Sequence, residues 1–259
     1  MHGFCSKKGH SIHRVRKYFI DTVSTEKSKT GSPGILYLVS TPIGNLEDIS
    51  LRALRILKEV HLIAAEDTRR TGFLLSHFGI TNKQESYYEY NKKKKIPLFL
   101  NRLLKGESIA VVSDAGTPGI SDPAFDLVQA AIQHGIPVVP IPGPTAVISA
   151  LIVSGLPTHR FVFEGFLPVK KGRKKRLEQL AQETRTIVLY ESPHRLLRTL
   201  KDVYETLGNR KVAIARELTK KFEEIVRGNL SECIDTFSKR KIQGEFVIII
   251  QGKEKDTPC

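Results

Sequence analysis

The chain alternates short apolar runs with stretches whose apolar residues recur at helical spacing. Residues 35–39 form a continuous apolar run, which is typical of a strand buried on both faces. Leu51, Leu54, Ile56 and Leu57 then recur as on one face of a helix over 50–59. The same alternation predicts further strands at 60–65, 108–113 and 137–141, and further helices at 68–78, 123–134 and 145–154. Repeated strand–helix units predict a parallel sheet with right-handed crossovers.

A turn-rich segment, Ser-Gly-Leu-Pro-Thr at 154–158, interrupts this pattern. Beyond it, apolar runs predict strands at 161–163, 186–190, 212–216, 222–227 and 246–250, and helical spacing predicts helices at 173–182 and 194–206. Several short strands so close together favour a mixed sheet. We therefore expect an α/β protein with two α/β domains, residues 35–155 and 159–252, and a cleft between them.

Residues 1–34 do not share the pattern. They hold seven Lys or Arg and two acidic residues, contain no apolar run, and end in the turn sequence Gly-Ser-Pro-Gly. A segment of this composition cannot bury enough apolar surface to fold by itself, so we predict a disordered basic extension.

Composition narrows the class of protein. With 259 residues and 40% hydrophobic content, the chain can build a real core, and no apolar run approaches the length of a membrane span. The three cysteines form no CxxC, and the eight histidines have no metal-ligand spacing. We expect a cytoplasmic protein with no metal site and no membrane association. The formal charge of +14 favours a polyanionic partner such as RNA, although a solvated basic surface would have the same charge.

Four loops that follow predicted strands carry polar or small residues. They read STPIGNL at 40–46, AEDTR at 65–69, SDAGTPGISDP at 113–123 and PIPGP at 140–144. The carboxyl ends of parallel strands share one edge of a sheet, and ligands bind there. None of the loops is a GxGxxG or a Walker A sequence, and each alone could be an ordinary turn.

Carboxylates in these loops are candidates for accepting a proton, and an arginine beside them could hold a phosphate. Asp67 and Asp122 also stand where they would cap the following helices, which is a structural role. The catalytic candidates are Glu66, Asp67, Arg69 and Asp114.

Two lysine-rich patches are candidates for RNA binding. Lys92, Lys93, Lys94 and Lys95 follow three tyrosines in a predicted loop, so that bases could stack while lysines meet phosphates. The second patch lies at the start of a predicted helix, where cations oppose the helix dipole and an external polyanion would offset the repulsion. It comprises Lys170, Lys171, Arg173, Lys174, Lys175 and Arg176. A solvated surface is the alternative for both patches.

Seven segments between about residues 35 and 250 resemble, in order, the ribosomal RNA small subunit methyltransferase I family. They are LVSTPIGNLEDIS, AAEDTRRT, SDAGTPGISDPAFDLV, IPGPTA, GFLPVKKGRKKR, YESPHR and ARELTKKFEE. The resemblance implies the tetrapyrrole methylase fold, which is the class III fold of S-adenosylmethionine (SAM)-dependent enzymes. It implies a homodimer that binds SAM between its two domains and methylates the ribose 2′-hydroxyl of cytidine 1402 in the 16S rRNA of the small ribosomal subunit.

Matched by motif, the resemblance implies a cofactor-binding shell drawn from both domains. Its members are Pro42, Ile43, Gly44, Asp114, Ala115, Gly116, Thr117, Ile120, Thr145, Ala146, Tyr190, Ala215 and Glu245.

The sequence leaves two other functions open. One is methylation of a tetrapyrrole precursor, although the GxGPGD-like turn typical of those enzymes is replaced by Thr-Pro-Ile-Gly-Asn at 41–45. The other is a non-catalytic RNA-binding role.

Overall fold

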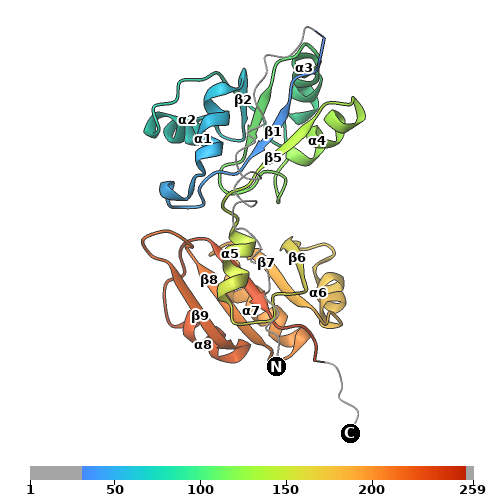
Figure 1. The fold of residues 1–259 in the computed structure, drawn as a ribbon. Helices are drawn as coiled ribbons and strands as arrows, with labels where there is room; N and C mark the ends of the chain where they lie inside the picture. Colours follow the sequence, from blue (N-terminus) through green and yellow to red (C-terminus); the bar gives the residue numbers. More distant parts are fainter. Residues whose placement is uncertain (1–30, 255–259) are drawn as a thin grey trace, which may run out of the picture.

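The computed structural model describes residues 31–254, which form two five-stranded sheets flanked by helices (Figure 1). The predicted disordered extension lies almost wholly outside the described residues. None of the helices within 31–254 combines the length and the apolar character that crossing a membrane requires.

The first sheet is entirely parallel, as the strand–helix alternation predicts. Its strands lie in the order β3-β2-β4-β1-β5. Their bounds are β1 (Leu36–Val39), β2 (Leu62–Ala65), β3 (Gln84–Ser86), β4 (Ile109–Val112) and β5 (Val138–Ile141). Every residue of β2 and β4 is buried, because helices cover both faces of the sheet.

Alternate strand residues contact different helices. Leu36, Leu62 and Val111 pack against α3 (Lys92–Leu104) and α4 (Ala124–Gln133). Tyr37 and Ile63 pack with residues of α1 (Leu51–Glu59) and α2 (Thr68–His77). The period-two alternation of strand side chains therefore supplies two hydrophobic layers from one set of apolar runs.

Two elements of this half are absent from the sequence prediction. Strand β3 is a polar edge strand, Gln-Glu-Ser, with no apolar run to indicate it. Helix α3 begins at Lys92, so the prediction of a loop at Lys92–Lys95 is wrong. Its first four residues are lysines and it contains Pro97, so the sequence does not indicate a helix here. The helix is stabilised by burial of Phe99, Leu100 and Leu103.

The second sheet is mixed, also as predicted, with the order β6-β7-β10-β8-β9. Strands β6 and β7 are parallel, and the other neighbouring pairs are antiparallel. The bounds are β6 (Phe161–Phe166), β7 (Thr186–Glu191), β8 (Lys211–Arg216), β9 (Glu224–Asn229) and β10 (Phe246–Ile250).

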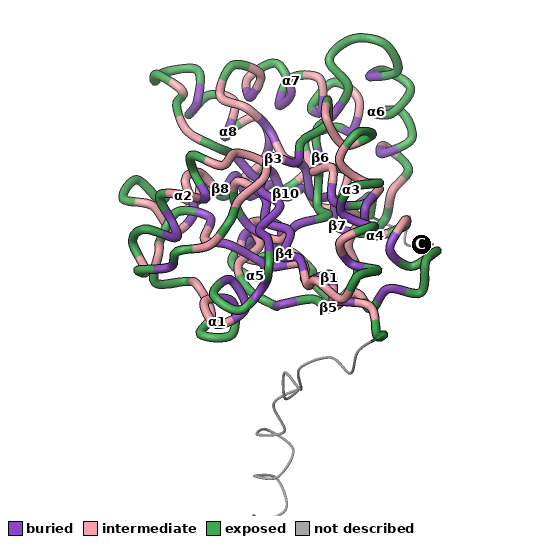
Figure 2. Tube along the Cα trace, turned by 90° about the horizontal axis from the view of Figure 1, so that it is seen from above, coloured by how far each residue is buried: buried purple, intermediate pink, exposed green. Residues whose placement is uncertain are grey.

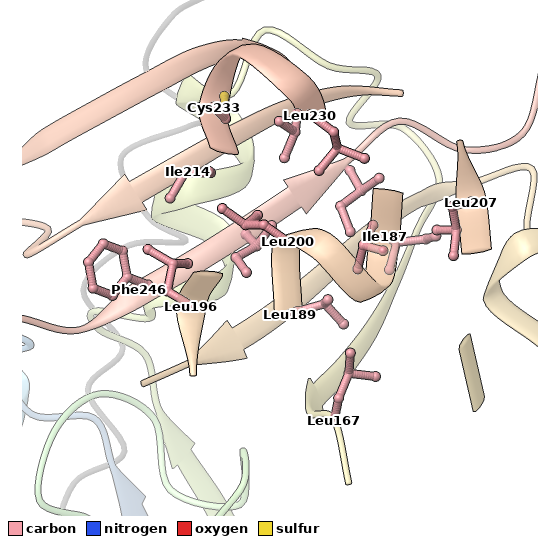
Figure 3. Close-up of a cluster of buried hydrophobic side chains, with 14 of the residues drawn as sticks. Leu167, Ile187, Leu189, Leu196, Leu200, Leu207, Ile214, Leu230, Cys233 and Phe246 are labelled. Atoms are coloured by element: carbon pink, nitrogen blue, oxygen red, sulfur yellow. The ribbon is translucent and has the colours of Figure 1, made fainter. Parts of the chain in front are cut away.

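Three helices cover one face of this sheet: α6 (Arg173–Ala181), α7 (Leu196–Leu207) and α8 (Leu230–Ser238). Figure 3 shows Leu196 and Leu200 of α7 pointing into a cluster with Ile187 and Ile214 from the strands. Helix α8 is not among the predicted helices, although its capping box of Asn229 and Glu232 is visible in the sequence.

The opposite face of the second sheet is covered by α5 (Ala146–Val153). Val147, Ala150 and Leu151 lie in one cluster with Val188, Ala213 and other residues of that sheet. The helix accordingly sits beside the second sheet in Figure 1. The domain boundary predicted at residue 155 thus falls after a helix that packs with the second domain.

Seen from above, buried residues concentrate at the centre of the molecule and exposed residues at its rim (Figure 2).

Candidate active site

Loops at the carboxyl ends of β1, β4 and β5 are joined directly to one another. Thr41 and Gly116 exchange backbone hydrogen bonds of 2.9 and 3.0 Å. The Thr117 hydroxyl donates to the Pro144 carbonyl at 3.0 Å and lies 3.0 Å from the Ser40 hydroxyl. Three of the four loops singled out in the sequence therefore form one rigid wall.

Gly116 permits this close arrangement. Its φ of +83° is a conformation that glycine adopts readily, and a Cβ there would come 3.3 Å from the Ile43 side chain. The absence of a side chain leaves room for the backbone of 114–117 to approach a ligand.

A cleft of about 400 Å³ lies between this wall and the edge of the second sheet. Most of the predicted site residues line it, from both halves of the chain: Ile43, Glu66, Asp114, Ala115, Gly116, Thr117, Ile120, Thr145, Ala146, Tyr190, Ala215 and Glu245. The volume falls within the range of pockets that hold drug-sized ligands. A site of this kind suits a ligand with both apolar and polar groups.

Glu66 and Asp114 bring two carboxylates together in the cleft. The Asp114 backbone N–H donates to Glu66 Oε2 at 3.2 Å, and Asp114 Oδ2 lies 3.3 Å from an Arg70 guanidinium nitrogen. Asp114 Oδ1 is buried and accepts no hydrogen bond from residues 31–254. A buried acceptor without a partner is costly, so it favours a ligand that brings a donor.

Burial raises the pKa of Glu66 above its usual value, and the nearby Asp114 and Asp122 carboxylates act in the same direction. The Asp114 N–H and Arg70 oppose this shift without cancelling it. A carboxylate whose pKa is raised in this way is a stronger base and a better proton acceptor. Among the predicted catalytic residues, Glu66 therefore has the environment of a general base.

Adjacent Asp67 has the opposite environment. It caps α2 through the Arg69 N–H at 2.8 Å, and its carboxylate pairs with the Arg69 side chain at 2.6 Å. These contacts hold the pKa of Asp67 well below its usual range. Asp67, Arg69 and Pro42 line a second hollow, the first-sheet hollow, which adjoins the cleft through Arg70, Ser113 and Asp114. The structure thus separates these three residues from the cleft itself.

Lys220, from the second half of the chain, also lines the cleft and bridges two carboxylates. Its ammonium group lies 3.0 Å from Glu217 and 2.8 Å from Glu245. Burial acts to lower the pKa of Lys220, but these two hydrogen bonds outweigh it and raise the pKa. Gly44 does not line the cleft and lies against this lysine, since a Cβ on Gly44 would collide with Lys220 Cγ. Lys220 therefore fixes Glu245 at the cleft and contacts the loop after β1.

Beneath the second-sheet edge lies a buried polar network. Glu191 accepts a hydrogen bond from Thr199 at 2.6 Å, and Thr199 accepts one from Arg173 at 2.8 Å. Arg173 also donates to Asp202 at 2.7 Å and to the Pro168 carbonyl. Its exposure is only 5%, so the prediction that Arg173 contacts RNA is corrected: its guanidinium is used inside the protein.

The other lysine-patch residues divide by exposure. Lys170, Lys171, Lys174 and Lys175 are exposed and make no ion pair with any residue of 31–254. Arg176 is exposed and pairs with Glu164 at 2.6 Å. In the first patch Lys93 and Lys94 are exposed, whereas Lys92 and Lys95 are partly buried and pair with acidic residues.

Sequence reasoning missed several residues that line the cleft. They are Arg70, Phe166, Ser192, Pro193, Leu218, Lys220, Phe246 and Val247. The ends of β7 and β10 meet there only because the two strands pair antiparallel, Glu191 opposite Phe246. Arg70 could have been found from its place beside Arg69. Among residues 31–254, no group of three or more His, Cys, Asp or Glu is placed to bind a metal ion.

Comparison with known proteins gives a family for this arrangement. Residues 35–234 match the family model of tetrapyrrole (corrin/porphyrin) methylases. A relative from Halalkalibacterium halodurans, named ribosomal RNA small subunit methyltransferase I, is 53% identical over 87% of this chain and 78% of its own length. Relatives of the same name from Synechocystis and Thermotoga maritima are 55% and 51% identical over 85% of this chain, and cover 79% and 100% of their own lengths.

Solved structures show the same fold at much lower identity. Uroporphyrin-III C-methyl transferase from Thermus thermophilus, in complex with S-adenosyl homocysteine, aligns with a TM-score of 0.61 at 21% identity, over 84% of this chain and 97% of its own. Cobalt precorrin-4 methyltransferase aligns with a TM-score of 0.63 at 18% identity, over 84% and 94%. The family model and the close relatives together show that the chain belongs to the ribosomal RNA small subunit methyltransferase I family of tetrapyrrole methylases.

Proposed function

We propose that the chain transfers the methyl group of SAM to the ribose 2′-hydroxyl of cytidine 1402 in 16S rRNA. Membership of the family makes it a SAM-dependent rRNA methyltransferase. The observation that carries the proposal is the cleft, which brings Glu66 and Asp114 of the first half beside Tyr190 and Ala215 of the second.

The residues of the cleft fit SAM. Ile43, Ala146, Ala215 and Val247 offer an apolar surface suited to an adenine ring. Asp114 Oδ1, which has no hydrogen-bond partner among the described residues, suits an amino or hydroxyl donor of the cofactor. When bound, SAM supplies an electrophilic methyl group on a sulfonium with a good leaving group. The residues of the chain then have to align the ribose, exclude water and take up one proton.

Glu66 is the proton acceptor in this proposal. A ribose hydroxyl is a weak acid, so its oxygen becomes an effective nucleophile as its proton passes to the Glu66 carboxylate. Arg70, at the boundary between the cleft and the first-sheet hollow, holds Asp114 at 3.3 Å and so keeps the second carboxylate in place. Asp67 is a helix cap in this account, and Arg69 is its partner.

A tetrapyrrole substrate is less well supported. Likeness to the tetrapyrrole enzymes rests on identities of 18–22%, whereas the rRNA enzymes reach about 50%. The four exposed lysines at 170–175 could bind RNA phosphates, whereas a small tetrapyrrole substrate gives them no such role. A non-catalytic role is disfavoured by the acceptor carboxylates that line the cleft.

The remaining partners belong to the same proposal. The chain acts on the small ribosomal subunit in the cytoplasm, and it does so as a homodimer. Sedimentation equilibrium of the purified protein tests the dimer: a mass of one chain would contradict it.

Methylation of isolated small subunits tests the function. Subunits from cells lacking the corresponding gene are incubated with protein and radiolabelled SAM, and their rRNA is digested to nucleosides. We expect label in 2′-O-methylcytidine. Label in a base-methylated nucleoside, or no label in rRNA, would refute the proposal.

A further inference from the structure

Phe166 lies at the junction of two hollows. It lines the cleft, and it also lines a hollow of about 350 Å³ formed with Leu167, Pro168, Lys175 and Arg176, which we call the basic hollow. In Figure 1 the strand that ends at Phe166, β6, runs beside α6, which carries the two cations. The route from the reacting centre to the basic hollow therefore passes this ring.

The ring of Phe166 is supported from within and exposed outside. Its centroid lies 5.6 Å from that of Tyr190, which in turn lies 5.0 Å from that of Phe163. The exposed fraction of Phe166 is nevertheless 53%. An aromatic ring that is held by others and left open to solvent at the edge of a site is suited to stacking on a base.

The charge around the basic hollow favours a polyanion. Lys175 makes no ion pair within residues 31–254, and neither do Lys170, Lys171 and Lys174 beside it. Glu164 is the one carboxylate among the described residues that lines this hollow, and it is paired with Arg176 at 2.6 Å. The first-sheet hollow differs, because Arg69 and Arg70 there already pair with Asp67 and Asp114.

We propose that Phe166 is a stacking platform for the nucleotide next to the methylated one, and that Lys175 holds the phosphate of that nucleotide in the basic hollow. This inference rests on the proposed function. It makes Phe166 a positioning residue, since stacking would fix the strand so that the neighbouring ribose lies in the cleft. The RNA must be unstacked at this point, because the faces of a base inside a helix are covered by the neighbouring bases.

The test compares Phe166→Leu, Phe166→Trp and a control, Phe125→Leu. Phe125 is a similarly exposed ring, at 59%, on α4, and lines neither the cleft nor either hollow. Each variant is assayed for kcat and KM on small subunits that lack the methyl group, and for SAM affinity by calorimetry. We expect Phe166→Leu to lower kcat/KM for subunits about tenfold and to leave SAM affinity within about threefold. Phe166→Trp should restore most of the loss.

Three results would overturn the inference. Phe166→Leu could behave like Phe125→Leu, or lose SAM affinity in proportion to its activity, or fail to be rescued by Phe166→Trp while folding normally. In each case the wild-type protein still methylates the subunit, so the proposed function stands. If the wild-type protein itself does not methylate the subunit, both proposals fail.

Discussion

Two neighbouring carboxylates, Glu66 and Asp67, show how strongly local contacts set chemistry. Glu66 is half-buried between acidic neighbours, and its pKa is raised. Asp67 caps a helix and pairs with Arg69, which lowers its pKa. Only the first has a proton affinity suited to deprotonating a hydroxyl near neutral pH.

We expect Glu66→Gln to lower kcat by about 10²-fold or more, because it removes the proton acceptor. The free energy of unfolding, in contrast, should not fall in this variant. A raised pKa means that the carboxyl contributes stability below its unfolded pKa and loses it as pH rises through the folded pKa. The glutamine side chain carries no charge, so the variant should be at least as stable as wild type at pH 7, and the difference should vanish below about pH 4.

Thermal melting from pH 3 to 8, with single-turnover rates, measures both effects. Asp67→Ala is the matched control: it should lower stability at neutral pH through loss of the cap while leaving most of the activity. Full activity in Glu66→Gln would show that the proton goes elsewhere.

Arg173 and Lys174 provide a second contrast between adjacent residues. Arg173 is buried with partners on Asp202, Thr199 and Pro168, whereas Lys174 is exposed. We expect Arg173→Ala to cost about 2–4 kcal/mol, because it removes a buried side chain together with its hydrogen bonds to Thr199 and Asp202. Lys174→Ala should leave the free energy of unfolding nearly unchanged. Urea denaturation distinguishes them, and equal values for the two variants would contradict the network.

At the scale of elements, α6 places cations where its own dipole repels them. Lys174 and Lys175 lie in its first turn, and Lys170 and Lys171 precede it. Replacing these four lysines by Ala should weaken binding to small subunits and flatten its salt dependence, since each lost phosphate contact removes about 0.7–0.9 from the slope. Filter binding at several salt concentrations measures this. An unchanged slope would assign the lysines to solvated surface, and unchanged SAM affinity is the control.

The elements that the sequence pattern predicts are those whose own residues drive their burial. Strands β1, β2 and β4 are continuous apolar runs, and α1 has a clear apolar face. Strand β3 and helix α3 were not predicted, because tertiary contacts rather than their own apolar residues stabilise them. Gln84–Ser86 forms a strand by pairing with β2, and Lys92 forms ion pairs with Glu89 and Asp126.

At the scale of the whole molecule, the cleft is built from two sheets that are far apart in sequence. The loops after β1, β2 and β4 could be predicted as one edge, because parallel strands end together. Phe166 and Lys220 could not, since their places depend on how the second sheet meets the first. The resemblance supplied Tyr190, Ala215 and Glu245, which spacing alone does not indicate.

A ligand that contacts both sheets should stabilise them together. With SAM at about 100 times its Kd, we expect the free energy of unfolding to rise by about 2.7 kcal/mol and the melting temperature by about 5–10 °C, in one transition. Differential scanning calorimetry measures both quantities. A shift confined to one of two separate transitions would place SAM within one half of the chain.

The most direct test of the central claim is the methylation state of cytidine 1402 itself. Small-subunit rRNA from cells with and without the gene is mapped for ribose 2′-O-methylation by its resistance to alkaline cleavage at each nucleotide. We predict that the mark at position 1402 is present with the gene, absent without it, and restored by this chain. A 2′-O-methyl group that persists at 1402 in cells lacking the gene, or is not restored by the chain, would contradict the account.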